Sequence, residues 1–177
     1  MKGLFFMKKI LILFVLAVIT ICYINSEEYV QIPSTSIRLR VIAASNNSKD
    51  QKDKIKVKNA VIKELNKVLY KINNYSDVEK SIEKNIDKLN NVVQKTLSNN
   101  DIEYGYTINY GLNYFPEKTY KGITYESGNY QSLVISLDEG KGENWWCALY
   151  PPLCQIDENI EDKEYSFLIK KVLSQYN

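Results

Sequence analysis

The residues best suited to covalent chemistry lie in one short segment, GKGENWWCALYPPLC, at positions 140–154. It holds both tryptophans, two of the three cysteines and two of the four prolines of the 177-residue chain. Cys147 and Cys154 flank Pro151 and Pro152, which can turn the chain back on itself. In an exported chain such a pair forms a disulfide, and closing so short a loop stabilises a fold by roughly 2.5 kcal/mol. We therefore predict a structural bridge.

A redox-active or nucleophilic cysteine pair is the alternative. The spacing is not that of a C-x-x-C motif, and the chain has no histidine that could activate a thiolate. The absence of histidine also excludes imidazole bases, Ser–His pairs and the usual zinc ligands. We predict no metal, no cofactor and no catalytic residue. A hydrolase that uses carboxylates such as Asp138, Glu139 or Glu126 stays open, as does a structural envelope module.

Two pairs of side chains are candidates for binding a protein partner. Trp145 and Trp146 are neighbours, so on a strand they point to opposite faces. One can enter the core while the other anchors a partner, although both could be buried. Arg38 and Arg40 share one strand face and could hold an anion or a partner carboxylate. Pairing with Asp or Glu at the surface is their alternative.

The amino terminus has the layout of a secretory signal or membrane anchor. Lys2, Lys8 and Lys9 precede the apolar residues 10–21. We assign residues 1–26 to this segment and residues 27–36 to a linker. Without these three lysines, the chain has 20 basic and 21 acidic residues. This nearly neutral balance does not indicate binding to nucleic acid. Eight lysines at positions 49–71 could touch anionic lipids near the anchor, or form a solvated helix face.

The hydrophobic pattern of residues 37–177 predicts a single α+β domain. Period-two alternation predicts strands, and apolar residues at steps of three and four predict helices. Ser48 with Gln51, and Ser76 with Glu79, are capping-box patterns. The expected order is a strand at 37–44, helices at 48–72 and 76–98, a strand from Ile102, an ordered loop or edge strand, a hairpin of strands at 133–138 and 144–150, and a final helix at 165–176. We expect a mainly antiparallel sheet with the helices on one face.

Four motifs together resemble the stage II sporulation protein R family. They are I-R-L-R-V-I-A-x-S at 37–45, D-Q-x-x-K-x-K-V-K-x-A-V at 50–61, N-Y-F-P-x-K-x-Y at 113–120 and G-x-G-x-N-W-W-C-x-L-x-P-P-L-C at 140–154. The resemblance covers about residues 37–156. It implies a signalling protein of endospore-forming bacteria that is made in the forespore and exported into the space between the two membranes. There it activates a membrane-embedded aspartic protease of the mother cell, which processes the sigma-E precursor.

Some positions depart from the family pattern. Arg40 stands where a histidine is usual, Ala44 where an asparagine is, and Val134 where an arginine is expected. The sequence Glu-Ser-Gly at 126–128 replaces Pro-Ala-Gly. These changes argue against any catalytic or metal role that depends on the histidine, and they leave the tryptophan–cysteine segment intact.

The residues and the resemblance together predict a ligand for a protein partner that acts outside the cell. The N-terminal segment would keep it near a membrane. We expect the partner-binding surface to contain Trp145, Trp146, Asn113, Tyr114, Phe115, Pro116, Arg38 and Arg40.

Overall fold

The computed structural model describes residues 8, 11–12, 14–20, 30–156 and 159–176. Most of the predicted signal or anchor at 1–26 lies outside these residues. Within the described part, no helix is both long and apolar enough to cross a membrane. The predicted linker at 27–36 includes a short strand, β1 (Val30–Gln31).

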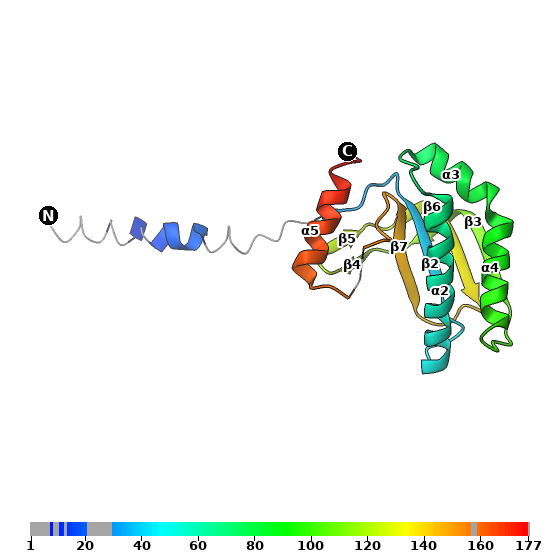
Figure 1. Cartoon of the computed structure of the whole chain (residues 1–177). Helices are drawn as coiled ribbons and strands as arrows, with labels where there is room; N and C mark the ends of the chain where they lie inside the picture. The colour runs from blue at the N-terminus through cyan, green and yellow to red at the C-terminus, as the bar shows by residue number, and fades with distance from the viewer. Residues whose placement is uncertain (1–7, 9–10, 13, 21–29, 157–158, 177) are drawn as a thin grey trace.

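A four-stranded mixed sheet forms the centre of the domain, with strand order β3-β6-β2-β7 (Figure 1). Its strands are β2 (Ile37–Ile42), β3 (Tyr106–Phe115), β6 (Gly128–Leu137) and β7 (Asn144–Tyr150). β2 runs parallel to β6 and antiparallel to β7, while β3 and β6 are antiparallel. The single α+β domain is therefore confirmed.

The predicted hairpin between the last two long strands is wrong. β7 does not return against β6, because β2 lies between them and pairs with both. The reason is burial: Leu39 and Val41 of β2 are fully buried, so this strand takes a central place. Turn residues between β6 and β7 indicate a chain reversal but do not say which strand the chain reaches.

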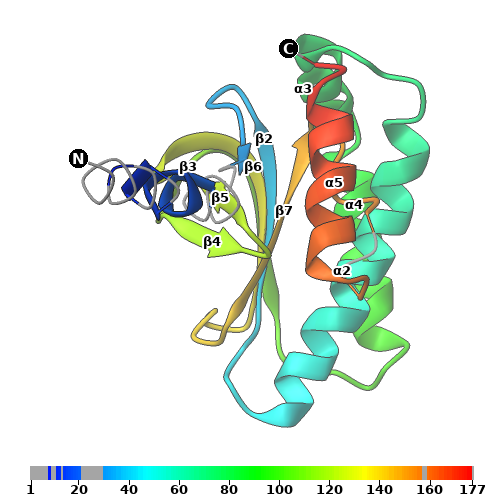
Figure 2. The ribbon, with the colours of Figure 1, turned by 90° about the vertical axis from the view of Figure 1, so that its left-hand side faces the viewer.

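Three helices cover one face of this sheet, as predicted (Figure 2). They are α2 (Ser48–Val68), α3 (Tyr75–Lys84) and α4 (Ile86–Ser98). Their apolar stripes pack on the sheet in one large core of aliphatic side chains, which includes Leu39, Val41, Val57, Val61, Leu65, Leu89, Val93, Leu133, Ile135 and Leu137. Each such side chain contributes about 1.5–3 kcal/mol of burial free energy.

The helix starts and one helix length differ from the prediction. Asn47 caps α2 and Asn74 caps α3, each side chain accepting the backbone N–H three residues on. Neither serine of the predicted capping boxes is the cap. The expected helix at 76–98 is divided at Asn85, which has φ −105° and ψ 12°. Apolar spacing continues across Asn85, so periodicity alone does not reveal the break.

A second, smaller unit contains the last helix and a three-stranded sheet of order β1-β5-β4. The strands β4 (Lys118–Tyr120) and β5 (Ile123–Tyr125) are a short hairpin within the segment predicted as an ordered loop or edge strand with a turn. Helix α5 (Asp162–Leu173) lies beside this sheet, apart from α2–α4 (Figure 1). A small core joins them, formed by Ile32, Ile123, Tyr125, Ala148, Leu153, Tyr165, Ile169 and Leu173.

Candidate functional site

The two tryptophans lie on opposite faces of β7, as the alternation of a strand requires. Trp145 packs against the large helix-covered core, and the Lys58 ammonium lies 4.7 Å from the centre of its ring. Trp146 points to the other face, where it meets Phe115 edge-to-face at 5.3 Å. Both side chains are half-buried. Their roles in partner binding stay a prediction.

The predicted Cys147–Cys154 disulfide is present in the structure, with Cα atoms 5.2 Å apart. It ties the chain that follows β7 back to the strand. The backbone N–H groups of Leu153 and Cys154 donate to the Ala148 carbonyl at 3.0 and 3.1 Å. The bridge and these hydrogen bonds hold the loop against one end of β7.

Arg38 is an interior residue, because only 2% of it is exposed. Its guanidinium carbon lies 3.4 Å from the centre of the Tyr130 ring and 5.3 Å from that of Phe115. It donates from Nε to the Ser36 hydroxyl at 3.3 Å, and from Nη1 to the Glu126 carbonyl at 3.4 Å. Aromatic rings, rather than carboxylates, surround this cation, and cation–π contacts of desolvated groups contribute about 2 kcal/mol.

Arg40 lies on the same face, with its guanidinium 4.7 Å from the centre of the Phe115 ring. Burial lowers the pKa of both Arg38 and Arg40, since desolvation disfavours the charged form. No carboxylate of the described residues forms an ion pair with either side chain. The expected surface pairing with Asp or Glu is therefore wrong: the β4–β5 hairpin and β3 bring Tyr125 and Phe115 over these positions.

The segment at 113–116 divides between the two sheet faces. Phe115 is fully buried between the two arginines, and Asn113 donates to the Ser132 hydroxyl at 3.0 Å on the same face. Tyr114 alternates to the other face and is 60% exposed, while Pro116 follows the strand and is exposed. The structure therefore brings Trp146, Phe115, Asn113, Arg38 and Arg40 to one face, but not Trp145 or Tyr114.

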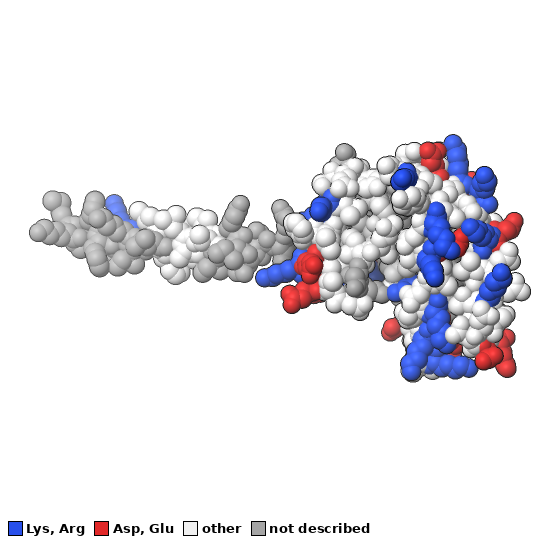
Figure 3. All heavy atoms as spheres, in the orientation of Figure 1, with Lys and Arg blue, Asp and Glu red and all other residues white. Residues whose placement is uncertain are grey.

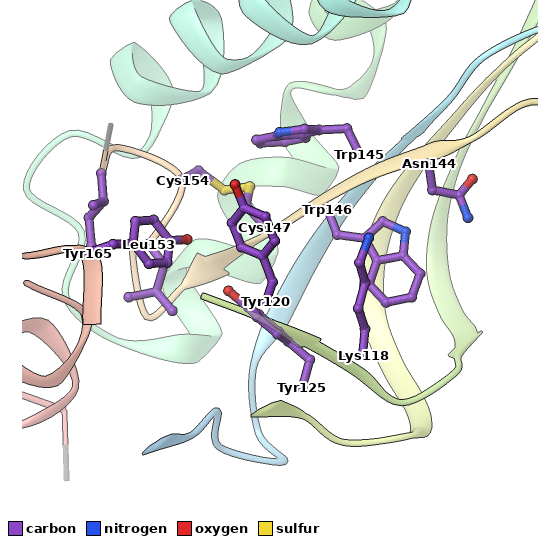
Figure 4. Close-up of a pocket in the computed structure, with 11 residues that line it drawn as sticks. Lys118, Tyr120, Tyr125, Asn144, Trp145, Trp146, Cys147, Leu153, Cys154 and Tyr165 are labelled. Atoms are coloured by element: carbon purple, nitrogen blue, oxygen red, sulfur yellow. A yellow bond between two sulfur atoms is a disulfide. The ribbon is translucent and has the colours of Figure 1, made fainter. Parts of the chain in front are cut away.

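A groove runs along β7 beside this cluster, between the strand, the β4–β5 hairpin and α5 (Figure 4). Its volume is about 220 Å³. We call it the β7 groove. The residues that line it are Lys118, Tyr120, Tyr125, Asn144, Trp145, Trp146, Cys147, Leu153, Cys154, Ile156 and Tyr165. Both tryptophans and the disulfide line it, with Trp145 and the disulfide on one side of β7 and Trp146 on the other.

Sequence reasoning missed the hairpin and helix residues of this groove. Tyr120, Tyr125 and Tyr165 gave only the signal of a tyrosine-rich composition, which does not say where the rings meet. Lys118 places its ammonium 5.2 Å from the centre of the Trp146 ring. Burial raises the pKa of Tyr125, so its phenol stays neutral. Among the described lining residues, Lys118 carries the one charge.

The lysines of α2 form a separate feature. Six of the eight at 49–71 are exposed, five of them along the outer surface of α2 (Figure 3) and Lys71 beyond its end, whereas Lys54 and Lys58 are buried. Lys56 and Lys67 pair with Asp53 and Glu64 of the same helix at 2.9 and 2.8 Å. A lipid contact by this face stays a prediction.

The groove is rich in tryptophan and tyrosine, which are enriched among the hot-spot residues of protein interfaces. A family model described as stage II sporulation protein R matches residues 33–160, which is more than half of the chain. The chain therefore belongs to the stage II sporulation protein R family, as the sequence motifs predicted.

Stage II sporulation protein R of Bacillus subtilis (strain 168) is 30% identical to this chain over 149 residues. The match covers 80% of this chain and 66% of that relative, so the chain spans just under two thirds of the relative's length. No solved structure matches the chain.

Proposed function

We propose that this protein is an exported sporulation signal that activates a membrane-embedded aspartic protease, which then processes the sigma-E precursor. It acts in the space between forespore and mother cell, secreted or held by its N-terminal segment. Family membership supports the sporulation role. The single observation that carries the binding role is the β7 groove, in which two half-buried tryptophans stand beside a disulfide.

Two features of the groove support a protein as the ligand. Tryptophan and tyrosine are enriched among the residues that dominate binding energy at protein interfaces. A disulfide next to the groove limits the movement of its wall, which lowers the entropy lost on binding. Disulfides persist in oxidising compartments, which agrees with action outside the membrane.

The carboxylates of the rival hydrolase do not converge. Glu126 precedes the ten-residue strand β6 and Asp138 follows it, so the two are separated by roughly 30 Å or more. Glu139 is an exposed neighbour of Asp138 and pairs with Lys141. A glycoside hydrolase needs two carboxyl groups about 5–10 Å apart on either side of the bond that is cut. Glu126 is too far from Asp138 and Glu139 for this, and those two follow each other in one turn. These residues therefore give no support to a carboxylate hydrolase.

The proposal is tested by reconstitution in a bacterium that does not form spores. The full chain, the suspected membrane protease and the sigma-E precursor are expressed together, and precursor cleavage is followed by immunoblot. We expect cleavage only when all three are present. Cleavage without this chain, or none with it, contradicts the proposal. A fusion of residues 1–40 to a reporter that is active only after export tests the location separately.

A further inference from the structure

The β7 strand has one free edge, and the β7 groove lies along it. In the four-stranded sheet β7 pairs only with β2, and in the small sheet β4 pairs only with β5 among the described strands. The groove is lined by residues of both edge strands, β7 and β4. An unpaired strand edge is a template for a further strand.

The hydrogen bonds show which residues of β7 face that edge. The Ala148 carbonyl accepts from Leu153 and Cys154, so it points away from β2, while the Glu143 carbonyl accepts from Ala43 and points toward β2. Along an antiparallel strand, residues whose N–H and C=O groups point toward one neighbouring strand alternate with residues whose groups point to the other side. Asn144 and Trp146 therefore direct their N–H and C=O groups outward, into the groove, and the disulfide-bound loop closes the edge at Ala148.

We propose that a protein partner binds here by adding an extended segment to the outward edge of β7 at Asn144 and Trp146. An acidic side chain of that segment lies next to Lys118. Backbone pairing with an exposed sheet edge is a common mode of peptide recognition, in which pockets for alternate side chains give specificity. This inference rests on the proposed function, because it describes how the partner of that function is held.

Two observations favour this occupant. The groove of about 220 Å³ is smaller than the roughly 300–1,000 Å³ of pockets that enclose small molecules, and suits an anchoring side chain. Its one lining charge among the described residues is the Lys118 cation, which attracts an acidic group.

The backbone contact is tested by two substitutions at one position. Asn144→Ala removes the side chain and keeps the outward N–H, whereas Asn144→Pro removes that N–H as well. Proline is tolerated as the first residue of a strand, which is the place of Asn144. One lost hydrogen bond lowers binding about fivefold. We expect Asn144→Pro to need about five times more protein than Asn144→Ala for half-maximal precursor cleavage.

Thermal unfolding of both variants shows whether they are folded. If both are folded and equally active, the strand-addition proposal is overturned. Amide hydrogen exchange of the wild-type chain gives a measurement that needs no variant. On mixing with membrane vesicles that carry the protease, exchange at Asn144 and Trp146 is expected to slow. Unchanged exchange at both amides, in a mixture that supports cleavage, also overturns the proposal.

The charge contact is tested by Lys118→Glu. Reversing this charge is expected to raise the protein concentration for half-maximal cleavage about tenfold, and to weaken its dependence on salt. The matched control is Lys95→Glu, the same change on the exposed face of α4. Equal effects of the two would contradict the acidic contact. A wild-type chain that triggers no cleavage overturns the proposed function too, whereas an active wild type with insensitive variants overturns strand addition alone.

Discussion

Trp145 and Trp146 are adjacent in the chain, but they belong to regions that are built differently. Trp145 packs on the large core, where three helices cover one sheet face with Val, Leu and Ile side chains. Trp146 belongs to the opposite face, where Phe115, the two arginines stacked on Phe115, and Lys118 of the short hairpin lie around it. Aliphatic packing and the Cys147–Cys154 disulfide hold the first region, because Cys147 shares the strand face of Trp145, whereas ring and cation–π contacts hold the second. The comparison teaches that one sheet separates a mainly aliphatic core from a face built of aromatic rings and arginines.

The largest expected loss of stability comes from opening a cavity in the large core. Leu133 is fully buried under the helices, so Leu133→Ala should lower the free energy of unfolding by about 3 kcal/mol. Urea denaturation followed by circular dichroism measures this loss. The matched change in the small core is Leu153→Ala, at a residue that is 2% exposed. A smaller loss is expected there, because the loop that carries Leu153 can collapse into the space. Equal losses would show that the two cores are equally rigid.

Removal of the disulfide should have the next largest effect. A double variant, Cys147→Ser with Cys154→Ser, loses the constraint on a loop of about eight residues, which corresponds to about 2.5 kcal/mol. The midpoint of urea unfolding should fall, and precursor cleavage should fall with it, because the bridge lies in the groove wall. The wild type with reductant should reproduce the stability loss. A reductant that changes nothing would mean that the bridge adds no stability.

Substitution of each tryptophan compares the two regions directly, because one variant should affect cleavage and the other stability. Trp146→Ala should reduce cleavage about thirtyfold, which corresponds to about 2 kcal/mol of lost binding. Trp145→Ala should mainly lower the melting temperature, because this ring packs on the large core. Thermal unfolding and cleavage are recorded for each variant. If both variants unfold early, the pair is structural. If both signal normally, the β7 groove is not the recognition surface.

The smallest expected effect is the stability that the Glu64 carboxylate of α2 contributes, which is lost in acid. Hydrogen bonds from Lys67 and Lys88 hold the pKa of the buried Glu64 carboxyl below its usual value. Such a group stabilises the fold above its unfolded pKa of about 4.3 and loses that contribution as the pH falls below this value. Glu64→Gln should therefore flatten the decrease in stability on acidification. Glu139→Gln, at an exposed ion pair, is the control and should not alter it.

Local patterns predicted most of the elements. Alternation identified the strand at 37–42, turn residues before Asn144 indicated the strand at 144–150, and apolar spacing identified α2, most of α3 and α4, and α5. Caps were misplaced by one or two residues, because Asn47 and Asn74 accept the N–H groups of Asp50 and Asp77 and so start each helix before its serine. The β4–β5 hairpin was left ambiguous, since its strands are three residues each and too short to show a period.

The sequence by itself determined the family, the paired cysteines and the opposite directions of the two tryptophans, because motifs and strand alternation are local properties of the chain. The tertiary structure decided that β2 separates β6 from β7, that Arg38 lies among rings, and that Lys118, Tyr125 and Tyr165 complete the groove. These outcomes depend on which surfaces far apart in the chain exclude water together. The hydrophobic effect acts between apolar surfaces whatever their separation in the sequence. Only the packed fold therefore selects these contacts.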